Sequence, residues 1–223
     1  MLSCIIPAHN ERARIARVLD VATTHPLIDE VIVVDDGSTD NTAAVVAAYD
    51  SIRLIAKPVN QGKSSAICDG VKAARGSILL FLDSDLVGLT GHDLTRLITP
   101  VTSDAADCSI SLRGNALLPW RLIGLDYVSG ERVLRHDLIA DHIKTIENLP
   151  SFGIEVYLNR LIVSSKCRIR IVQWENVFSP YKSSKYGLWK GVNAEMRMLT
   201  DIVQTVPVTD SGIQIAAMLR AKV

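Results

Sequence analysis

Several features that would identify other classes of protein are missing from this sequence. Its 223 residues carry 24 Lys and Arg against 24 Asp and Glu, so no excess of positive charge exists to form a broad nucleic-acid surface. No apolar run approaches the ~20 residues that a membrane-spanning helix needs, and Met1 leads directly into a strand-like segment without the basic start of a signal peptide. We therefore expect a cytoplasmic protein that neither spans a membrane nor binds nucleic acid.

Cysteine is also scarce. The four cysteines, Cys4, Cys68, Cys108 and Cys167, lie far apart, and three of them fall in apolar or strand-like runs. This spacing disfavours a disulfide framework and a zinc site, and it predicts buried, reduced thiols. Repeats, low-complexity tracts and long linkers are absent as well, so either one large globular domain or one domain with an appended helical segment is expected.

The first 85 residues alternate between apolar runs and amphipathic segments. Strands are predicted at residues 2–6, 30–34, 52–56 and 78–82, with helices around 15–22, 43–49 and 66–74 between them. Such alternation is typical of an open, mostly parallel α/β sheet flanked by helices. A further helix at 93–101 and a strand at 107–112 would continue the sheet, and residues 113–120 would follow as a loop.

The most informative stretch is the end of the fourth predicted strand. Five consecutive apolar residues, 78–82, are followed at once by Asp83, Ser84 and Asp85. Ligands of open α/β sheets bind outside the carboxyl ends of the strands, and hard divalent cations prefer oxygen ligands. The pair therefore predicts a metal that joins the protein to a diphosphate, whereas a simple turn or helix cap is the alternative.

The first two strands also end in polar turns. Asn10 and Glu11 follow the first strand and read either as a helix cap with its first-turn acid or as ligands. Asp35, Asp36 and Ser38 follow the second, and capping does not require both aspartates. We therefore expect one of these aspartates to face a ligand.

The loop before the third helix resembles half of a phosphate-binding loop. Gly62 permits close backbone approach, and Lys63 supplies a cation at a helix N-terminus, where anions are favoured. The full Walker pattern is absent, and a solvated surface lysine is the alternative.

Together these motifs resemble the family-2 type of glycosyltransferases with the GT-A fold. The resemblance is carried by Ile-Pro-Ala-His-Asn-Glu11, Val-Val-Asp-Asp-Gly-Ser-Thr-Asp40, Asn-Gln-Gly-Lys63 and Leu-Phe-Leu-Asp-Ser-Asp85, in this order. It implies a nucleotide-sugar donor and a Mn²⁺ or Mg²⁺ ion, with Asp85 as chief metal ligand and Asp83 as a second. It also implies a nucleotide site formed by Pro7, Ala8, Asn10, Glu11, Asp36, Ser38, Gly62, Lys63, Asp83 and Ser84.

Residues beyond 112 are expected to bind the acceptor. In relatives, a Ser/Thr-Gly stretch such as Ser129-Gly130 forms the floor of the acceptor pocket, and Arg132 and Arg135 could grip a phosphate or carboxylate. Two solvated arginines are the alternative. The expected division is 1–112 for the donor half, 113–183 for the acceptor half, and 184–223 for a C-terminal helical segment.

A second candidate catalytic group is Glu155. It shares one stripe of a mostly apolar helix, 149–163, with Asn159, an unfavourable arrangement unless the stripe faces a polar cleft. Glu155 could deprotonate the acceptor or, in a retaining enzyme, orient the acceptor or stabilise developing positive charge, and the resemblance places such a Glu at the reaction centre. A structural ion pair with Arg160 or Arg132 is the alternative.

The C-terminal part adds fewer signals. Relatives often place a metal-binding His near residue 179, whereas this chain has Ser179, so the third metal ligand is open. Helices are predicted at 188–203 and 213–219, and the last one would serve as a dimer or core contact or rest on an anionic membrane surface.

The predicted function is metal-dependent transfer of a sugar from a UDP- or GDP-sugar to an acceptor hydroxyl or phosphate. The acceptor could be a lipid phosphate, a small phosphorylated molecule or a carbohydrate. A sugar-1-phosphate nucleotidyltransferase is one alternative, although it should open with a Gly-rich loop that residues 7–11 lack. A non-catalytic nucleotide-sugar binder is the other.

Overall fold

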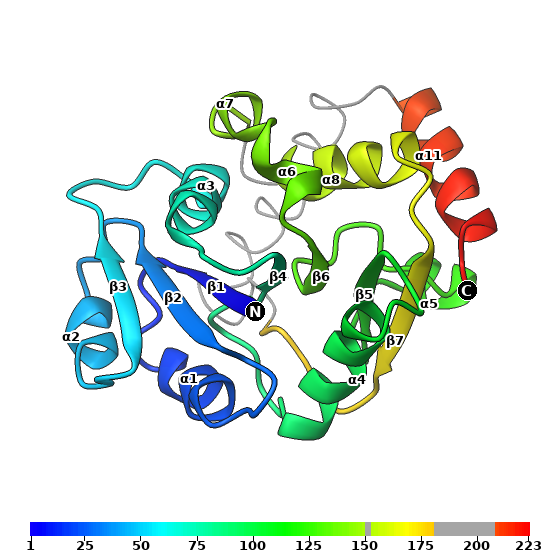
Figure 1. Ribbon diagram of the computed structural model, residues 1–223. Coiled ribbons are helices and arrows are strands. Elements are labelled where there is room, and N and C mark those ends of the chain that lie inside the picture. The colour runs from blue at the N-terminus through cyan, green and yellow to red at the C-terminus, as the bar shows by residue number, and fades with distance from the viewer. Residues whose placement is uncertain (150–152, 181–207) are drawn as a thin grey trace.

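A seven-stranded sheet runs through the centre of the protein (Figure 1). The computed structural model describes residues 1–149, 153–180 and 208–223. The strand order is β3-β2-β1-β4-β6-β5-β7. Their bounds are β1 Leu2–Ala8, β2 Glu30–Asp35, β3 Ile52–Ala56, β4 Ile78–Phe81, β5 Cys108–Arg113, β6 Arg132–Arg135 and β7 Ile169–Trp174.

The first four strands are parallel, and all four lie where the sequence predicts them. β1 pairs with β2 on one side and with β4 on the other, and β2 pairs with β3. The chain therefore winds outward from β1 to β3 and then crosses to β4 on the opposite side. This reversal of strand order is the topological switch point at which open α/β sheets bind ligands.

The strand β6 was not predicted, and it changes the second half of the sheet. It is antiparallel to both β4 and β5, whereas β5 and β7 are parallel to each other. The register pairs Arg132 with Phe81 and Arg135 with Ile78, so the two arginines lie at opposite ends of β4. Four residues are too few to carry a clear alternating pattern, which explains why the sequence did not reveal this strand.

Helices cover both faces of the sheet (Figure 1). α1 and α4 pack on one face, and α3, α6, α7, α8 and α11 pack on the other. Their bounds are α1 Ile15–Thr23, α2 Thr42–Val46, α3 Lys63–Ala73, α4 Gly91–Thr102, α5 Leu118–Ile123, α6 Asp137–Ala140, α7 Ile143–Ile146, α8 Gly153–Ser164 and α11 Val208–Arg220.

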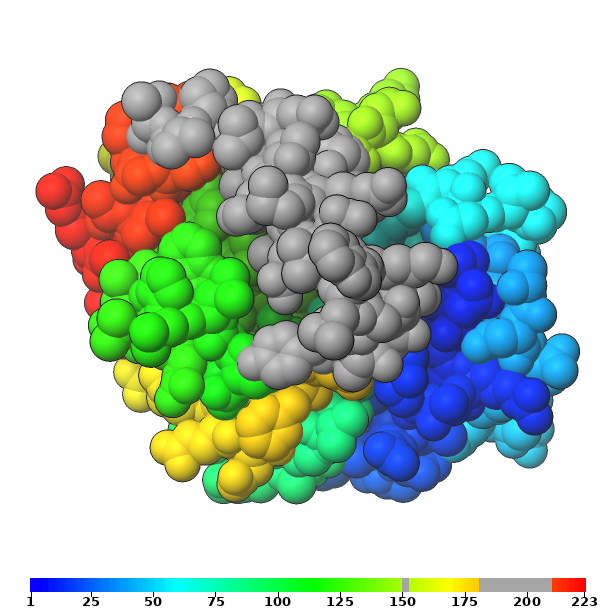
Figure 2. Space-filling model, turned by 180° about the vertical axis from the view of Figure 1, so that it is seen from behind, coloured from blue at the N-terminus to red at the C-terminus, as the bar shows by residue number. Residues whose placement is uncertain are grey.

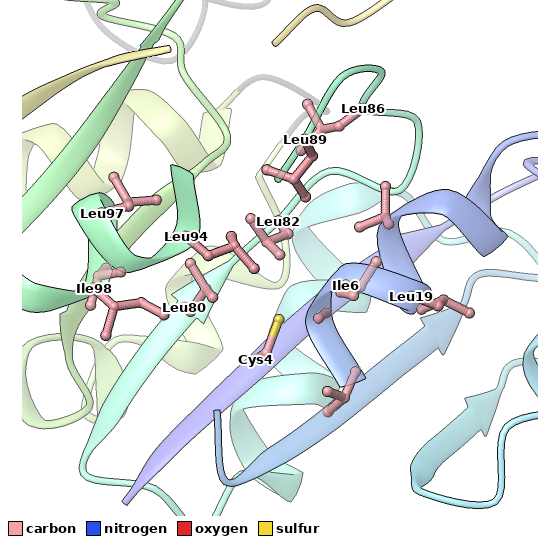
Figure 3. Close-up of a cluster of buried hydrophobic side chains, with 14 of the residues drawn as sticks. Cys4, Ile6, Leu19, Leu80, Leu82, Leu86, Leu89, Leu94, Leu97 and Ile98 are labelled. Carbon is pink, nitrogen blue, oxygen red and sulfur yellow. The ribbon is translucent and has the colours of Figure 1, made fainter. Parts of the chain in front are cut away.

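Figure 3 shows the core between α1, α4 and the sheet, where Cys4 and Ile6 of β1 meet Leu80 of β4 and Leu94 of α4. These side chains are all fully buried, because the central strands are covered on both faces. The four cysteines are buried free thiols, as predicted. No helix among the described residues has the length and apolarity needed to cross a lipid bilayer.

Some predicted elements need correction. Residues 113–120 were expected to form a loop, but α5 begins at Leu118, and Pro119 occupies a first-turn position that suits proline. The helix predicted at 188–203 lies outside the described residues, whereas the predicted C-terminal helix is part of α11. The division into 1–112, 113–183 and 184–223 stays a prediction, and its first boundary falls near the end of β5 inside the continuous sheet.

Candidate functional site

A cavity of about 360 Å³ opens where β1, β2 and β4 end and α3 begins. Its walls come from four separate segments of the chain, all at the carboxyl edge of the sheet. It is lined by Pro7, Ala8, His9, Glu11, Asp36, Asn60, Gly62, Lys63, Ala66, Asp83, Ser84 and Asp85. Nine of these residues are predicted site residues, so the polar strand ends do gather around one cavity.

Asn10 and Ser38 lie behind this lining and join the first two turns. The backbone N–H of Asn10 donates to Ser38 Oγ at 2.9 Å, and the side-chain Oδ1 of Asn10 accepts from the backbone N–H of Thr39 at 2.8 Å. Asn10 has a φ of 56°, and α1 begins only after Arg14, so Asn10 is not the cap of that helix. Its side chain instead fixes the β1 turn against the β2 turn.

Asp36 holds the loop before α3. Its Oδ1 and Oδ2 accept the backbone N–H groups of Gln61 and Gly62 at 3.0 and 2.7 Å, and Lys57 Nζ lies 3.2 Å from Oδ1. The neighbouring Asp35 accepts from the Ser38 N–H and hydroxyl within its own turn. Asp36 is therefore the aspartate that borders the cavity, whereas Asp35 shapes the turn.

Lys63 lies at the centre of the site. It begins α3 directly after Gly62, whose φ of 93° is a conformation that favours glycine. Lys63 Nζ lies 2.7 Å from Asp83 Oδ1 and 2.8 Å from Glu155 Oε1. One ammonium group thus joins the end of β4 to α8.

These contacts determine the charge of the pair. Burial alone would lower the pKa of Lys63, but the carboxylates of Asp83 and Glu155 outweigh it and hold the pKa above its ordinary value. Burial would likewise raise the pKa of Asp83, but Lys63 and Arg113 reverse the effect and hold it below its ordinary value. Lys63 and Asp83 are therefore both charged at neutral pH.

Gly130 packs against this ion pair. A Cβ atom at Gly130 would lie 2.7 Å from Asp83 Oδ1 and 2.8 Å from Lys63 Nζ. No side chain fits there without moving the pair. The turn before β6 is thus in contact with the site, although Gly130 does not line the cavity.

Glu155 has one oxygen in use and one unused. Its Oε1 contacts Lys63, whereas its buried Oε2 has no hydrogen-bond partner among the described residues. A buried carboxylate oxygen without a partner is unfavourable, and such atoms cluster at functional sites. The structure pairs Glu155 with Lys63, so the alternative of an ion pair between Glu155 and Arg160 or Arg132 is wrong.

The predicted acceptor arginines need correction. Arg132 is 1% exposed, and its guanidinium donates to the Ser129 carbonyl and, at 3.0 Å, to Asn159 Oδ1. It therefore holds the 129–131 turn and α8 from inside the protein and presents no surface to an acceptor. Arg135 lies at the far end of β4 from the cavity and pairs with Asp137, because β6 is antiparallel to its neighbours.

A second buried charge cluster was missed. Arg113, at the end of β5, lies 3.4 Å from both Asp126 Oδ2 and Glu131 Oε1, and Glu131 Oε2 accepts from the Ser111 hydroxyl at 2.8 Å. Burial raises the pKa of Glu131, partly offset by Arg113. Arg113 is the last residue of the buried strand β5, as Asp35 is of β2, so a search for charged residues at strand ends could also have found Arg113.

Asp85 and Ser179 lie together at the outer side of the site. Arg113 Nη1 donates to Ser179 Oγ at 2.6 Å, and Ser179 Oγ lies 3.4 Å from Asp85 Oδ1. Across residues 1–149, 153–180 and 208–223, no group of three His, Cys, Asp or Glu side chains could hold a metal ion. The oxygens of Asp83 and Asp85 do fit a hard cation that takes its other ligands from a diphosphate and water.

Comparisons with known proteins are consistent with this geometry. The model of glycosyl transferase family 2 matches residues 3–151. A dolichyl-phosphate beta-glucosyltransferase from Dictyostelium discoideum is 35% identical over 178 residues, which cover 73% of this chain and 49% of that protein. A glucosyl-3-phosphoglycerate synthase from Mycobacterium tuberculosis is 37% identical over 95 residues, which cover 39% of this chain and 29% of that protein.

Solved structures share the fold. The M. tuberculosis glucosyl-3-phosphoglycerate synthase in complex with Mn²⁺, UDP and glucosyl-3-phosphoglycerate superposes with a TM-score of 0.70 at 24% identity, covering 92% of this chain and 79% of that one. The same enzyme with Mg²⁺ and UDP gives a TM-score of 0.69. These neighbours identify the fold as GT-A. The chain spans half or less of the length of the curated relatives described above.

Proposed function

The chain belongs to glycosyl transferase family 2, and we propose that it transfers a sugar from a nucleoside diphosphate sugar to an acceptor hydroxyl or phosphate. The observation that carries this proposal is the meeting of three strand ends and the start of α3 at one cavity. Asp36, Lys63 and Asp85, which are far apart in the sequence, all line it. Such convergence at a switch point supports a nucleotide site.

UDP is the proposed nucleotide, because the structural neighbours contain UDP. The β1 and β2 turns, with Pro7, Ala8, Glu11 and Asp36, would hold the nucleoside. Lys63 would face the diphosphate at the N-terminus of α3, where negative charge is favoured. Asn10 and Ser38 would act indirectly, since their hydrogen bonds fix the two turns against each other.

We assign a divalent cation, Mn²⁺ or Mg²⁺, to the turn after β4. Asp85 would be its chief protein ligand and Asp83 a second, while Ser179 stands beside Asp85 in place of a histidine. When bound, such a cation neutralises the charge that develops on the leaving diphosphate. The remaining chemistry falls to residues of the chain itself.

Glu155 would act on the acceptor side. With a hydroxyl acceptor, the new bond forms between the acceptor oxygen and the anomeric carbon, the bond from that carbon to the diphosphate breaks, and the hydroxyl proton passes to Glu155. A phosphate acceptor is already ionised and needs no base, so Glu155 would then orient it. In either role, Lys63 would hold the Glu155 carboxylate in position through their 2.8 Å contact.

The test is release of free nucleoside diphosphate from a panel of UDP- and GDP-sugars, with Mn²⁺ and with EDTA. We expect release from a UDP-sugar that depends on the cation and is lost in Asp85→Asn, while Asp50→Asn, at an exposed aspartate, behaves as wild type. Reaction of a nucleoside triphosphate with a sugar 1-phosphate would instead identify a nucleotidyltransferase. Donor binding without turnover in any acceptor mixture would identify a non-catalytic binder.

A further inference from the structure

The helix α5 leaves its apolar side chains outside the protein. None of its residues is buried, and Leu118 and Leu122, four residues apart on one face, are 64% and 77% exposed. Leu117 and Ile123 are exposed as well. Figure 2 shows this segment, in green, at the surface beside α11. Clustered exposed apolar side chains mark an interaction surface more often than scattered ones.

The inner side of α5 is held in place. The ring of Trp120 packs against Tyr127 with centroids 5.9 Å apart, and α5 ends at Gly124, whose φ of 68° lets the chain turn sharply. The exposed leucines therefore sit on an anchored helix. We call Leu117, Leu118, Arg121, Leu122 and Ile123 the α5 surface.

Positive charge accompanies these apolar groups. Arg121 lies on α5 itself, and Lys222 Nζ donates to the carbonyl of Gly124 at 3.1 Å. The acidic residue Glu175 lines the neighbouring cavity together with Leu118, Arg121 and Leu122. Apolar side chains with adjacent cations match the interfacial region of an anionic bilayer, where both kinds of group are stabilised.

One arginine connects the α5 surface to the functional site through hydrogen bonds. A cavity of about 540 Å³ beside α5 is lined by Arg113, Gly114, Leu118, Arg121 and Leu122 among others. Arg113 also donates to Ser179, which lies next to Asp85. The Arg113 guanidinium therefore borders the α5 cavity and is connected to Asp85 of the proposed donor site through Ser179.

We propose that the α5 surface rests on an anionic lipid bilayer and that a phosphorylated lipid in that bilayer is the acceptor. The choice of acceptor rests on the proposed function, whereas the membrane contact does not. A small soluble acceptor would give no reason for leucines to be exposed beside the site. The surface is a short helix flanked by cations, which favours a charged bilayer over a second copy of the chain.

The experiment is co-sedimentation of the full chain with phosphatidylcholine vesicles with and without phosphatidylglycerol, at low and high salt. We expect binding to the anionic vesicles at low salt. Leu118→Asp with Leu122→Asp should reduce it at least tenfold, because two apolar contacts are replaced by charges that the bilayer repels. Arg121→Gln should reduce it about fivefold, since each cation near such a surface contributes on the order of 1 kcal/mol.

Leu27→Asp is the matched control. It makes the same change at an exposed leucine before β2, in the other half of the sheet, and should bind vesicles like wild type. Unchanged UDP binding and thermal unfolding of the double variant would show that the fold is intact. If wild type does not bind anionic vesicles, or if the double variant binds equally well, the membrane contact is wrong.

The acceptor is tested by UDP release with polyprenyl phosphate supplied in vesicles or in detergent. The rate of UDP release by the double variant should fall at least tenfold with vesicles. In detergent, where no bilayer has to be reached, the double variant should keep the wild-type rate. Turnover with soluble acceptors alone would overturn the lipid acceptor.

Self-association that the double variant abolishes, without vesicle binding by wild type, would identify α5 as a contact between copies. Failure of UDP binding would contradict the proposed function but leave the vesicle result valid.

Discussion

The ammonium of Lys63 and the carboxylate of Glu155 lie 2.8 Å apart, although 92 residues separate them in the chain. The same ammonium lies 2.7 Å from Asp83. Since Lys63 begins α3, Asp83 follows β4 and Glu155 lies in α8, three elements meet at one cation. Any change at Lys63 should therefore affect folding and both halves of the proposed site.

Lys63→Met should destabilise the protein by about 3 kcal/mol, because Asp83 and the deeply buried Glu155 lose their shared cation. Urea unfolding would measure this loss. Lys72→Met is the matched control, because Lys72 makes a comparable 3.1 Å pair with Glu147 at the surface, and exposed pairs contribute less than ~1 kcal/mol. Equal losses in the two variants would contradict a central role for Lys63.

Gly130→Ala should weaken UDP binding about tenfold, since the new Cβ would lie within 3 Å of both Asp83 Oδ1 and Lys63 Nζ and displace the ion pair. Calorimetric titration with UDP and Mn²⁺ would measure it. Gly212→Ala, in α11, meets no atom within 4 Å and should leave binding unchanged while stabilising the helix slightly. A Gly130→Ala protein that binds UDP with wild-type affinity would show that the position of the Lys63–Asp83 ion pair is unimportant for UDP binding.

Glu155→Gln should lower turnover by about a hundredfold if Glu155 is the base, while donor affinity changes little. Glutamine keeps the shape and can still accept a hydrogen bond from Lys63, so the loss would report on proton transfer. Steady-state kcat and the Kd for UDP separate the two effects. A retained kcat with a hydroxyl acceptor would rule out the base and leave the orienting role for a phosphate acceptor.

The stability difference between wild type and Lys63→Met should become smaller both in acid and in strong base. The pKa of Asp83 is held below its ordinary value, so its contribution is present above about pH 4, the unfolded value, and is lost as the pH falls through the lower folded value. The pKa of Lys63 is raised, so its contribution is present below about pH 10.4 and is lost as the pH rises through the higher folded value.

Urea unfolding of wild type and Lys63→Met across the pH range would measure this. The difference in their free energies of unfolding should be constant from about pH 5 to 9 and should shrink below about pH 4. A difference that grows in acid would show that the Lys63–Asp83 pair is not what stabilises the native state.

Much of the donor side was predictable because its signals are local. Buried parallel strands are continuous apolar runs, and each run ends visibly at Asp36, Asp83 or a neighbouring polar residue. The ends of parallel strands must share one edge, so these side chains could be expected to meet before any coordinates were known. Lys63 followed from its place after a permissive glycine at a helix start.

The acceptor side was less predictable because its geometry is not local. The short strand β6 runs against its neighbours, and this direction sends Arg135 to the wrong edge and buries Arg132. The partner of Glu155 likewise depends on how α8 packs across the sheet, and the sequence suggested an arginine in place of Lys63.

The sequence by itself determined the parallel core, the buried thiols and the polar strand ends, since periodicity and turn chemistry act over a few residues. Only the tertiary structure decided which charges neutralise one another, because pairing inside a protein depends on distances of 3 Å between segments that are remote along the chain. The exposure of α5 was decided in the same way, since an apolar helix is exposed or buried according to what else the fold places against it.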